Sequence, residues 1–98
     1  MYTIRQTPEF KRWLSHIHDG VTKRRLARRL EKAELGDLGD VKPVGSGVFE
    51  MREFFGPGWR MYYIQRGSVL IVMLGGGDKS TQDADIAKAI KLVATIED

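Results

Sequence analysis

The chain has 98 residues, 42% of them hydrophobic, which suits one domain with a single core and excludes a disordered tail. It has no cysteine, which excludes disulfides and thiolate metal sites, and neither a signal-peptide core nor an apolar run that would cross a bilayer. We therefore expect a cytoplasmic protein with no membrane partner. The net charge of +3 is uneven, with nine Lys/Arg against four Asp/Glu in residues 1–36, which favours an anionic partner.

The first third of the chain predicts one strand followed by two helices. Residues 2–6 alternate as a short strand does, and Thr7-Pro8-Glu9 is typical of a helix start. Asp19-Gly20 would break this helix and cap the next, which we expect over residues 21–35 with Gly36 as its stop. The helices should form a hairpin whose apolar stripes face inward, formed by Phe10, Trp13, Leu14 and Ile17, and by Leu26, Leu30 and Ala33.

The rest of the chain predicts a loop, three strands and a helix. Residues 37–47 are rich in Gly and Asp and are expected to be loop. Strands are expected at 48–55, 59–66 and 68–74, joined by turns short enough to require antiparallel hairpins. Residues 75–77 should end this meander. Ser80 and Asp83 resemble a capping box before a helix over residues 81–96.

This order, β-α-α-β-β-β-α, predicts an α+β fold with a helical hairpin packed on a mainly antiparallel sheet. We expect the helices to cover one face of the sheet and to leave part of the other face open.

The densest charge lies in the second predicted helix. Four of its cations follow i, i+3, i+4, i+7 spacing and predict a basic ridge opposite the apolar stripe. Such a ridge is a solvated helix face, a track for RNA phosphates or a surface for an acidic protein. The cations of this stretch are Lys23, Arg24, Arg25, Arg28, Arg29 and Lys32.

Arginines also occur on two predicted strands. Alternation places Glu50 and Arg52 on one face with Phe54, and Arg60 on one face with Tyr62. A sheet face with Arg and Tyr can hold a phosphate and stack a base. The alternative is that a glutamate on these strands pairs with an arginine across the sheet.

Two further patterns are weaker. Residues 74–82, LGGGDKSTQ, place glycines between a strand and a helix, but Asp78 stands where a Walker loop needs glycine, so a tight connection is an equal interpretation. His16 and His18 would project about 200° apart on a helix and cannot share a metal, so we expect no metal and no cofactor.

Several stretches together resemble the addiction-module killer proteins, in the HigB-like branch of the RelE/ParE toxin superfamily. These stretches are TPEFKRWL, RLARRLEKAELGDLGDVKPVGSGVFEMR, GPGWRMYY and GGGDKSTQDADIAKA, and they span nearly the whole chain in order. The resemblance implies a RelE/ParE-like fold and the toxin of a type II toxin-antitoxin system, with a helix-turn-helix antitoxin as partner.

The implied activity is metal-independent cleavage of mRNA in the ribosome, which arrests translation and growth. Inhibition of DNA gyrase without catalysis, as in the ParE branch, is the main alternative. A module that only binds the antitoxin is another.

The resemblance also implies roles for individual residues. Arg60 matches an arginine that RelE-like toxins carry on the middle strand and would stabilise the phosphate, with Arg52 as a second candidate. Lys79 would hold phosphate or protonate the leaving group. Asp78, Glu50 and Tyr62 are candidates for proton transfer or base positioning. The chain lacks the C-terminal tyrosine of RelE-like enzymes and the histidines of some HigB toxins, so no general base is identified.

Overall fold

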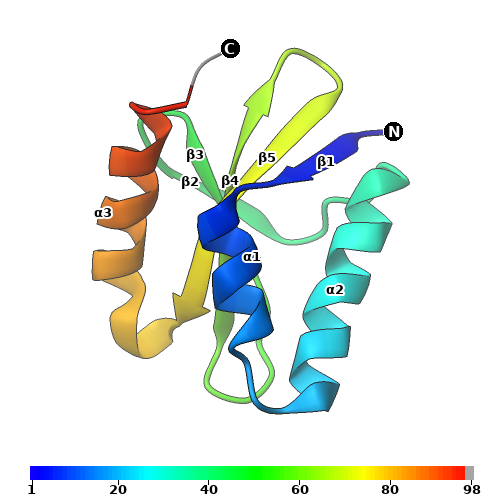
Figure 1. Cartoon of the computed structure of the whole chain (residues 1–98). Coiled ribbons are helices and arrows are strands. Elements are labelled where there is room, and N and C mark those ends of the chain that lie inside the picture. The colour runs from blue at the N-terminus through cyan, green and yellow to red at the C-terminus, as the bar shows by residue number, and fades with distance from the viewer. Residues whose placement is uncertain (97–98) are drawn as a thin grey trace.

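The computed structural model describes residues 1–96 and contains a five-stranded sheet with three helices (Figure 1). The elements in chain order are β1 (Thr3–Gln6), α1 (Pro8–Ser15), α2 (Gly20–Glu34), β2 (Val41–Gly45), β3 (Val48–Arg52), β4 (Trp59–Arg66), β5 (Leu70–Asp78), a 3₁₀ turn (Lys79–Thr81) and α3 (Gln82–Val93). The α+β class and the two-helix hairpin are as predicted.

The sheet has the order β1-β5-β4-β3-β2 and is mainly antiparallel. Strands β2 to β5 form an antiparallel meander, whereas β1 pairs in parallel with β5. Residues 59–66 form the central strand β4 with the bounds that alternation predicted.

Both N-terminal helices begin where the sequence indicated. The Thr7 hydroxyl accepts a hydrogen bond from the Phe10 N–H at 3.1 Å, and Asp19 accepts from the N–H groups of Val21 and Thr22. These side chains satisfy amide groups that the first helical turn leaves without backbone partners. At the other end of α2, Gly36 has a φ of +101°, which stops the helix at little steric cost. The two histidines lie in the connection between α1 and α2 rather than in a helix.

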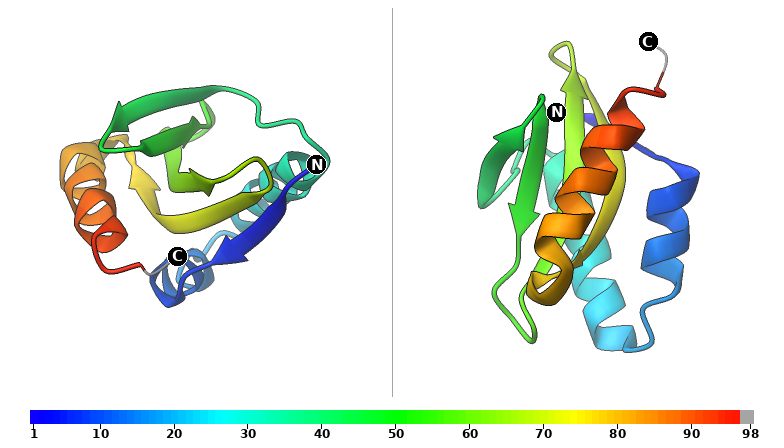
Figure 2. Two further views of the ribbon diagram at one scale, coloured as in Figure 1. Left: turned by 90° about the horizontal axis from the view of Figure 1, so that it is seen from above. Right: turned by 90° about the vertical axis from the view of Figure 1, so that its left-hand side faces the viewer.

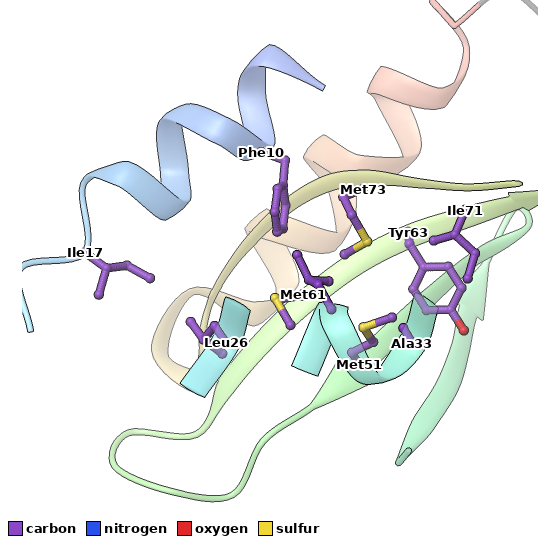
Figure 3. Close-up of a cluster of buried hydrophobic side chains, with 10 residues drawn as sticks. Phe10, Ile17, Leu26, Ala33, Met51, Met61, Tyr63, Ile71 and Met73 are labelled. Atoms are coloured by element: carbon purple, nitrogen blue, oxygen red, sulfur yellow. The ribbon is translucent and has the colours of Figure 1, made fainter. Parts of the chain in front are cut away.

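The main core lies between the helical hairpin and one face of the sheet (Figure 3). Phe10 of α1 and Leu26 of α2 are completely buried. They pack with sheet residues that share one face by alternation, namely Met51, Met61, Tyr63, Ile71 and Met73. The predicted stripes of both helices therefore do face inward.

The opposite face of the sheet is covered by α3, and the prediction of an open second face was wrong there (Figure 2). Tyr62, Ile64 and Leu74 on this face are almost fully buried, and α3 packs against them through Ile86, Ala89, Ile90 and Val93. The strands carry apolar residues on both faces, and burying the second set requires a second layer. The helix itself was predicted, but the face that it covers was not.

Three local predictions were wrong. Residues 41–45 form the edge strand β2 rather than loop, because Pro43, which cannot join a central ladder, is tolerated at an edge. Residues 75–77 continue β5 rather than end it, since they pair with β4 up to Asp78. The capping box is also absent: Asp78 caps the 3₁₀ turn by accepting from the Ser80 N–H at 2.8 Å, and Thr81 before α3 makes no side-chain cap.

Candidate functional site

Four of the predicted site residues meet on the α3 face of the sheet. In the β3–β4 ladder Arg52 lies opposite Arg60, and Glu50 lies opposite Tyr62. Residues opposite each other in a ladder share a face, so the grouping predicted from alternation is confirmed. The like charges of Arg52 and Arg60 are each offset by a carboxylate, Asp40 for Arg52 and Glu50 for Arg60.

Arg60 is held firmly from its buried side. Only 4% of the residue is exposed, and its Nη1 donates to the backbone oxygens of Glu53 and Trp59 at 3.2 and 3.0 Å. Its Nε lies 3.7 Å from Glu50 Oε1. A guanidinium fixed in this way loses little rotamer freedom when it binds a ligand.

Glu50 and Tyr62 lie beneath Arg60 and are closed off from solvent. Glu50 is 1% exposed and Tyr62 is fully buried. Gln82, in the first turn of α3, donates to Glu50 Oε2 at 2.8 Å. Burial and the nearby Glu50 carboxylate raise the pKa of Tyr62 above its ordinary range. The expectation that these two residues contact a nucleotide on an open sheet was therefore wrong, since they are buried on the face that α3 covers. Glu50 pairs with Arg60 instead.

The solvent side of the site carries an aromatic ring. Phe54, just beyond β3, is 70% exposed, and its centroid lies 5.4 Å from Arg52 Cζ and 5.5 Å from Arg60 Cζ. Arg52 donates to Asp40 Oδ1 through Nε at 3.1 Å and Nη2 at 2.9 Å. An exposed ring flanked by two guanidinium groups offers a stacking surface beside positive charge.

Lys79 reaches the same place from the far end of β5. Its Cγ and Cδ lie 2.9 Å from the position that a Cβ on Gly58 would occupy, and Arg60 Nη1 lies 3.6 Å from that position. Gly58 has a φ of +82°, which favours glycine, and its missing side chain lets Lys79 cross the turn towards Arg60. Asp78 accepts hydrogen bonds from the Ser80 hydroxyl and N–H, which hold its pKa below the usual range.

We call Arg52, Phe54, Arg60 and Lys79 the strand-end cluster. It combines three cations with one exposed ring at one end of the sheet, and the cations come from three different strands or their ends. Cations of this kind can neutralise a phosphate and the ring can stack a base. Asp78 borders the cluster but is a weak proton acceptor because its own turn stabilises the carboxylate.

The basic ridge of α2 differs from its prediction at one residue. Arg29 is 8% exposed and pairs with Glu53, and it donates to the backbone oxygens of Leu38, Asp40 and Arg52 at 2.7–3.2 Å. The prediction that Arg29 belongs to the exposed ridge was wrong, because residues 37–40 fold back over its side chain. The flanking cations Arg25, Arg28 and Lys32 are exposed around a hollow of about 270 Å³.

Lys23 and Arg24 lie on the first turns of the same helix. Lys23 donates to the Ser15 backbone oxygen at 3.2 Å, and Arg24 is exposed. The ridge therefore joins the α1–α2 connection to the hollow.

Two residues of the site had no assigned role from sequence. Alternation placed Phe54 beside Arg52, and the sequence signal for a role was a phenylalanine close to a Gly-Pro-Gly turn, where side chains are often exposed. Gln82 gave no signal, because its contact with Glu50 joins residues 32 positions apart.

Residues 1–96 lack two kinds of feature. No group of three or more His, Asp or Glu side chains is placed to hold a metal ion. None of the helices combines the length and apolar character that crossing a membrane requires.

No known family model matches the chain. The sequence is 42% identical over 91 residues to a protein of Haemophilus influenzae that is described as an uncharacterized protein, and the match covers 93% of this chain and 91% of that protein. The similarity thus extends through both the helical hairpin and the strand-end cluster. The chain belongs to the same protein family as this Haemophilus influenzae protein.

Proposed function

We propose that this protein is the toxin of a type II toxin-antitoxin system, with a RelE/ParE-like fold, and that it cleaves mRNA on the ribosome in the cytoplasm. The strand-end cluster is the observation that carries the proposal. Its fixed Arg60, the nearby Lys79 and the exposed Phe54 ring suit a phosphate flanked by an unstacked base. The motif resemblance described above supplies the toxin family and the helix-turn-helix antitoxin as partner.

The proposed reaction is attack of a ribose 2′-OH on its own 3′ phosphate. A bond forms between the 2′ oxygen and phosphorus while the bond to the 5′ oxygen breaks, leaving a 2′,3′-cyclic phosphate and a 5′-OH. Arg60, held by Glu50 and two backbone oxygens, stabilises the charge that develops on phosphate. Lys79 donates a proton to the departing 5′ oxygen, and water takes the proton of the 2′-OH.

In this scheme, most of the acceleration of RNA cleavage comes from the fixed cations Arg60 and Lys79. Glu50 and Tyr62 are too deeply buried to reach the ribose, and Asp78 is engaged by Ser80. The proposal assigns the ordering of the mRNA to the ribosome, because positioning alone can lower such a barrier by several kcal/mol. In this scheme the exposed ridge cations Arg25, Arg28 and Lys32 dock on ribosomal RNA.

The decisive experiment is a transcript-end map after the protein is induced in bacteria. We expect new 5′-OH ends inside translated coding sequences, together with growth arrest. Growth arrest with intact transcripts and inhibited DNA supercoiling would contradict the proposal and favour gyrase inhibition, and absence of toxicity would favour a module that only binds the antitoxin.

A matched pair of lysine variants tests the site. Lys79→Ala should abolish the new transcript ends, whereas Lys42→Ala should leave them unchanged, because Lys42 is an exposed lysine on the edge strand β2. Equal cleavage by both variants would show that Lys79 has no part in the reaction.

A further inference from the structure

The last part of β5 has a strand partner on one side only. Strand β4 pairs with β5 as far as Asp78, whereas the pairing of β1 stops at Met73. The chain leaves the sheet there, because Thr7 caps α1 and donates its N–H to the Met73 backbone oxygen at 3.1 Å. Within residues 1–96, no strand covers Gly75–Asp78 on the β1 side.

The backbone at this edge points outward at Gly76. Successive residues of an antiparallel strand direct their N–H and C=O alternately toward and away from the partner strand. The Met73 carbonyl turns to β1 and hence away from β4. The bulge at Leu74 shifts the alternation by one residue, so Gly76 also turns its N–H and C=O away from β4. An added strand would find these groups available for hydrogen bonds.

A groove of about 590 Å³ runs along this edge between α1 and α3. In Figure 1 the end of β5 passes between these two helices, and Figure 2 shows them on different sides of the strand. Trp13 of α1 and Leu92 of α3 form apolar walls, and Gly75 and Gly76 lie at the floor. A Cβ on Gly75 would meet nothing within 4 Å, so side chains of an added strand would have room there.

The rim of the groove favours an acidic occupant. Arg12, Lys88 and Lys91 are exposed on its two sides. The acidic residues of the rim are Glu9, which is exposed, and Asp85, which accepts a hydrogen bond from the Thr81 hydroxyl at 2.6 Å. The balance of these charges is positive, and a partner with carboxylates would complement it.

The outer edge of β2 lacks these features. Pro43 and Lys42 lie on it, and the pairing with β3 is interrupted by a bulge between Pro43 and Gly45. Proline, lysine and bulges are the features by which proteins protect a strand edge from further pairing. The edge of β5 at Gly75–Asp78 carries no proline or lysine.

From this contrast we propose that an extended, acidic segment of a partner protein binds in the groove between α1 and α3 and adds to β5 as a further strand. Main-chain hydrogen bonds to β5 hold the segment, and its carboxylates face Arg12, Lys88 and Lys91. The proposal is independent of RNA cleavage, since the groove does not include the strand-end cluster.

The test uses a short blocked peptide that alternates glutamate and valine, added to the ¹⁵N-labelled protein. We expect the amide signals of residues 75–78 to shift most, and we expect these shifts to reach a plateau as the peptide concentration rises. A peptide with lysine in place of glutamate and one with methylated backbone nitrogens should each bind much more weakly, because the first loses the charge match and the second loses the hydrogen bonds. Equal binding of the lysine peptide, shifts centred on β2, or no saturable shift would overturn the proposal.

A charge-reversal variant tests whether the peptide binds in the groove or is attracted only by the net positive charge of the protein. Lys88→Glu with Lys91→Glu should weaken the glutamate peptide about tenfold, as expected for two exposed ion pairs, and should strengthen the lysine peptide. Lys11→Glu is the matched control, because Lys11 is an exposed lysine of α1 outside the groove. An equal loss in the control would assign the binding to net charge and reject the site.

Discussion

Arg29 on α2 and Arg60 on β4 are both more than nine-tenths buried, yet their guanidinium groups have different surroundings. Arg29 is surrounded by acceptors, with three backbone oxygens and Glu53 around it. Arg60 contacts Glu53 O, Trp59 O and Glu50. The exposed Phe54 ring lies 5.5 Å from its Cζ, and Lys79 and Arg60 both lie beside Gly58. Burial of an arginine therefore shows only that its side chain is constrained. The positions of its partners indicate whether the guanidinium group is fully occupied within the fold or could also bind a ligand.

The largest effect should follow from Arg60→Lys. Lysine keeps a positive charge beside Glu50 but cannot place the guanidinium fork, so we expect cleavage to fall by about 10²–10³-fold, as when one oxyanion donor is removed. The rate of appearance of cleaved mRNA ends in a purified translation system measures this loss. A nearly unchanged rate would show that Arg60, like Arg29, has only a structural role.

The next largest effect concerns the stability that Arg29 provides. Arg29→Met should lower the free energy of unfolding by about 3 kcal/mol, because it leaves Glu53 and several backbone oxygens without their partner. Arg28→Met, one residue away and exposed, should change it by less than about 0.5 kcal/mol. Urea denaturation of both variants measures the contrast, and similar stabilities would show that the buried pair is dispensable.

Alkaline pH tests the burial of Tyr62 on the α3 face of the sheet. Because the native pKa of Tyr62 is raised, an unfolded chain ionises this residue at a lower pH than the folded one. The stability contributed by neutral Tyr62 is therefore complete below about pH 10 and is lost as the pH rises, by up to about 1.4 kcal/mol per unit. Tyr62→Phe should reduce this slope in urea denaturation, leaving the part due to Tyr63, whose pKa burial also raises. An unchanged slope would mean that Tyr62 ionises freely in the native state.

The smallest effect belongs to the exposed part of the α2 ridge. Arg28→Ala with Lys32→Ala should weaken ribosome binding about fivefold and lower its dependence on salt, since each lost phosphate contact retains its counterions. Stability should not change, because both side chains are exposed. Sedimentation with ribosomes at several salt concentrations tests this, and a salt dependence equal to that of the unchanged protein would exclude RNA docking by these residues.

Local chemistry determined much of the fold from the sequence alone. The caps Thr7 and Asp19 and the stop at Gly36 follow from contacts within a few residues, and the flanking turns indicated the bounds of β4. Alternation also placed Arg52 beside Phe54 and Arg60 beside Tyr62, because strand geometry fixes which side chains share a face.

Tertiary structure decided which of these side chains meet solvent. Whether α3 would cover the second sheet face, and whether residues 37–40 would fold over Arg29, depend on contacts between residues far apart in the chain, such as Gln82 with Glu50. Strand β2 was missed for a different reason: it pairs with the neighbouring strand β3, and this pairing outweighs the weak strand propensity of Gly and Pro. Periodicity specifies the direction of a side chain relative to its own element, but burial depends on what packs against that element.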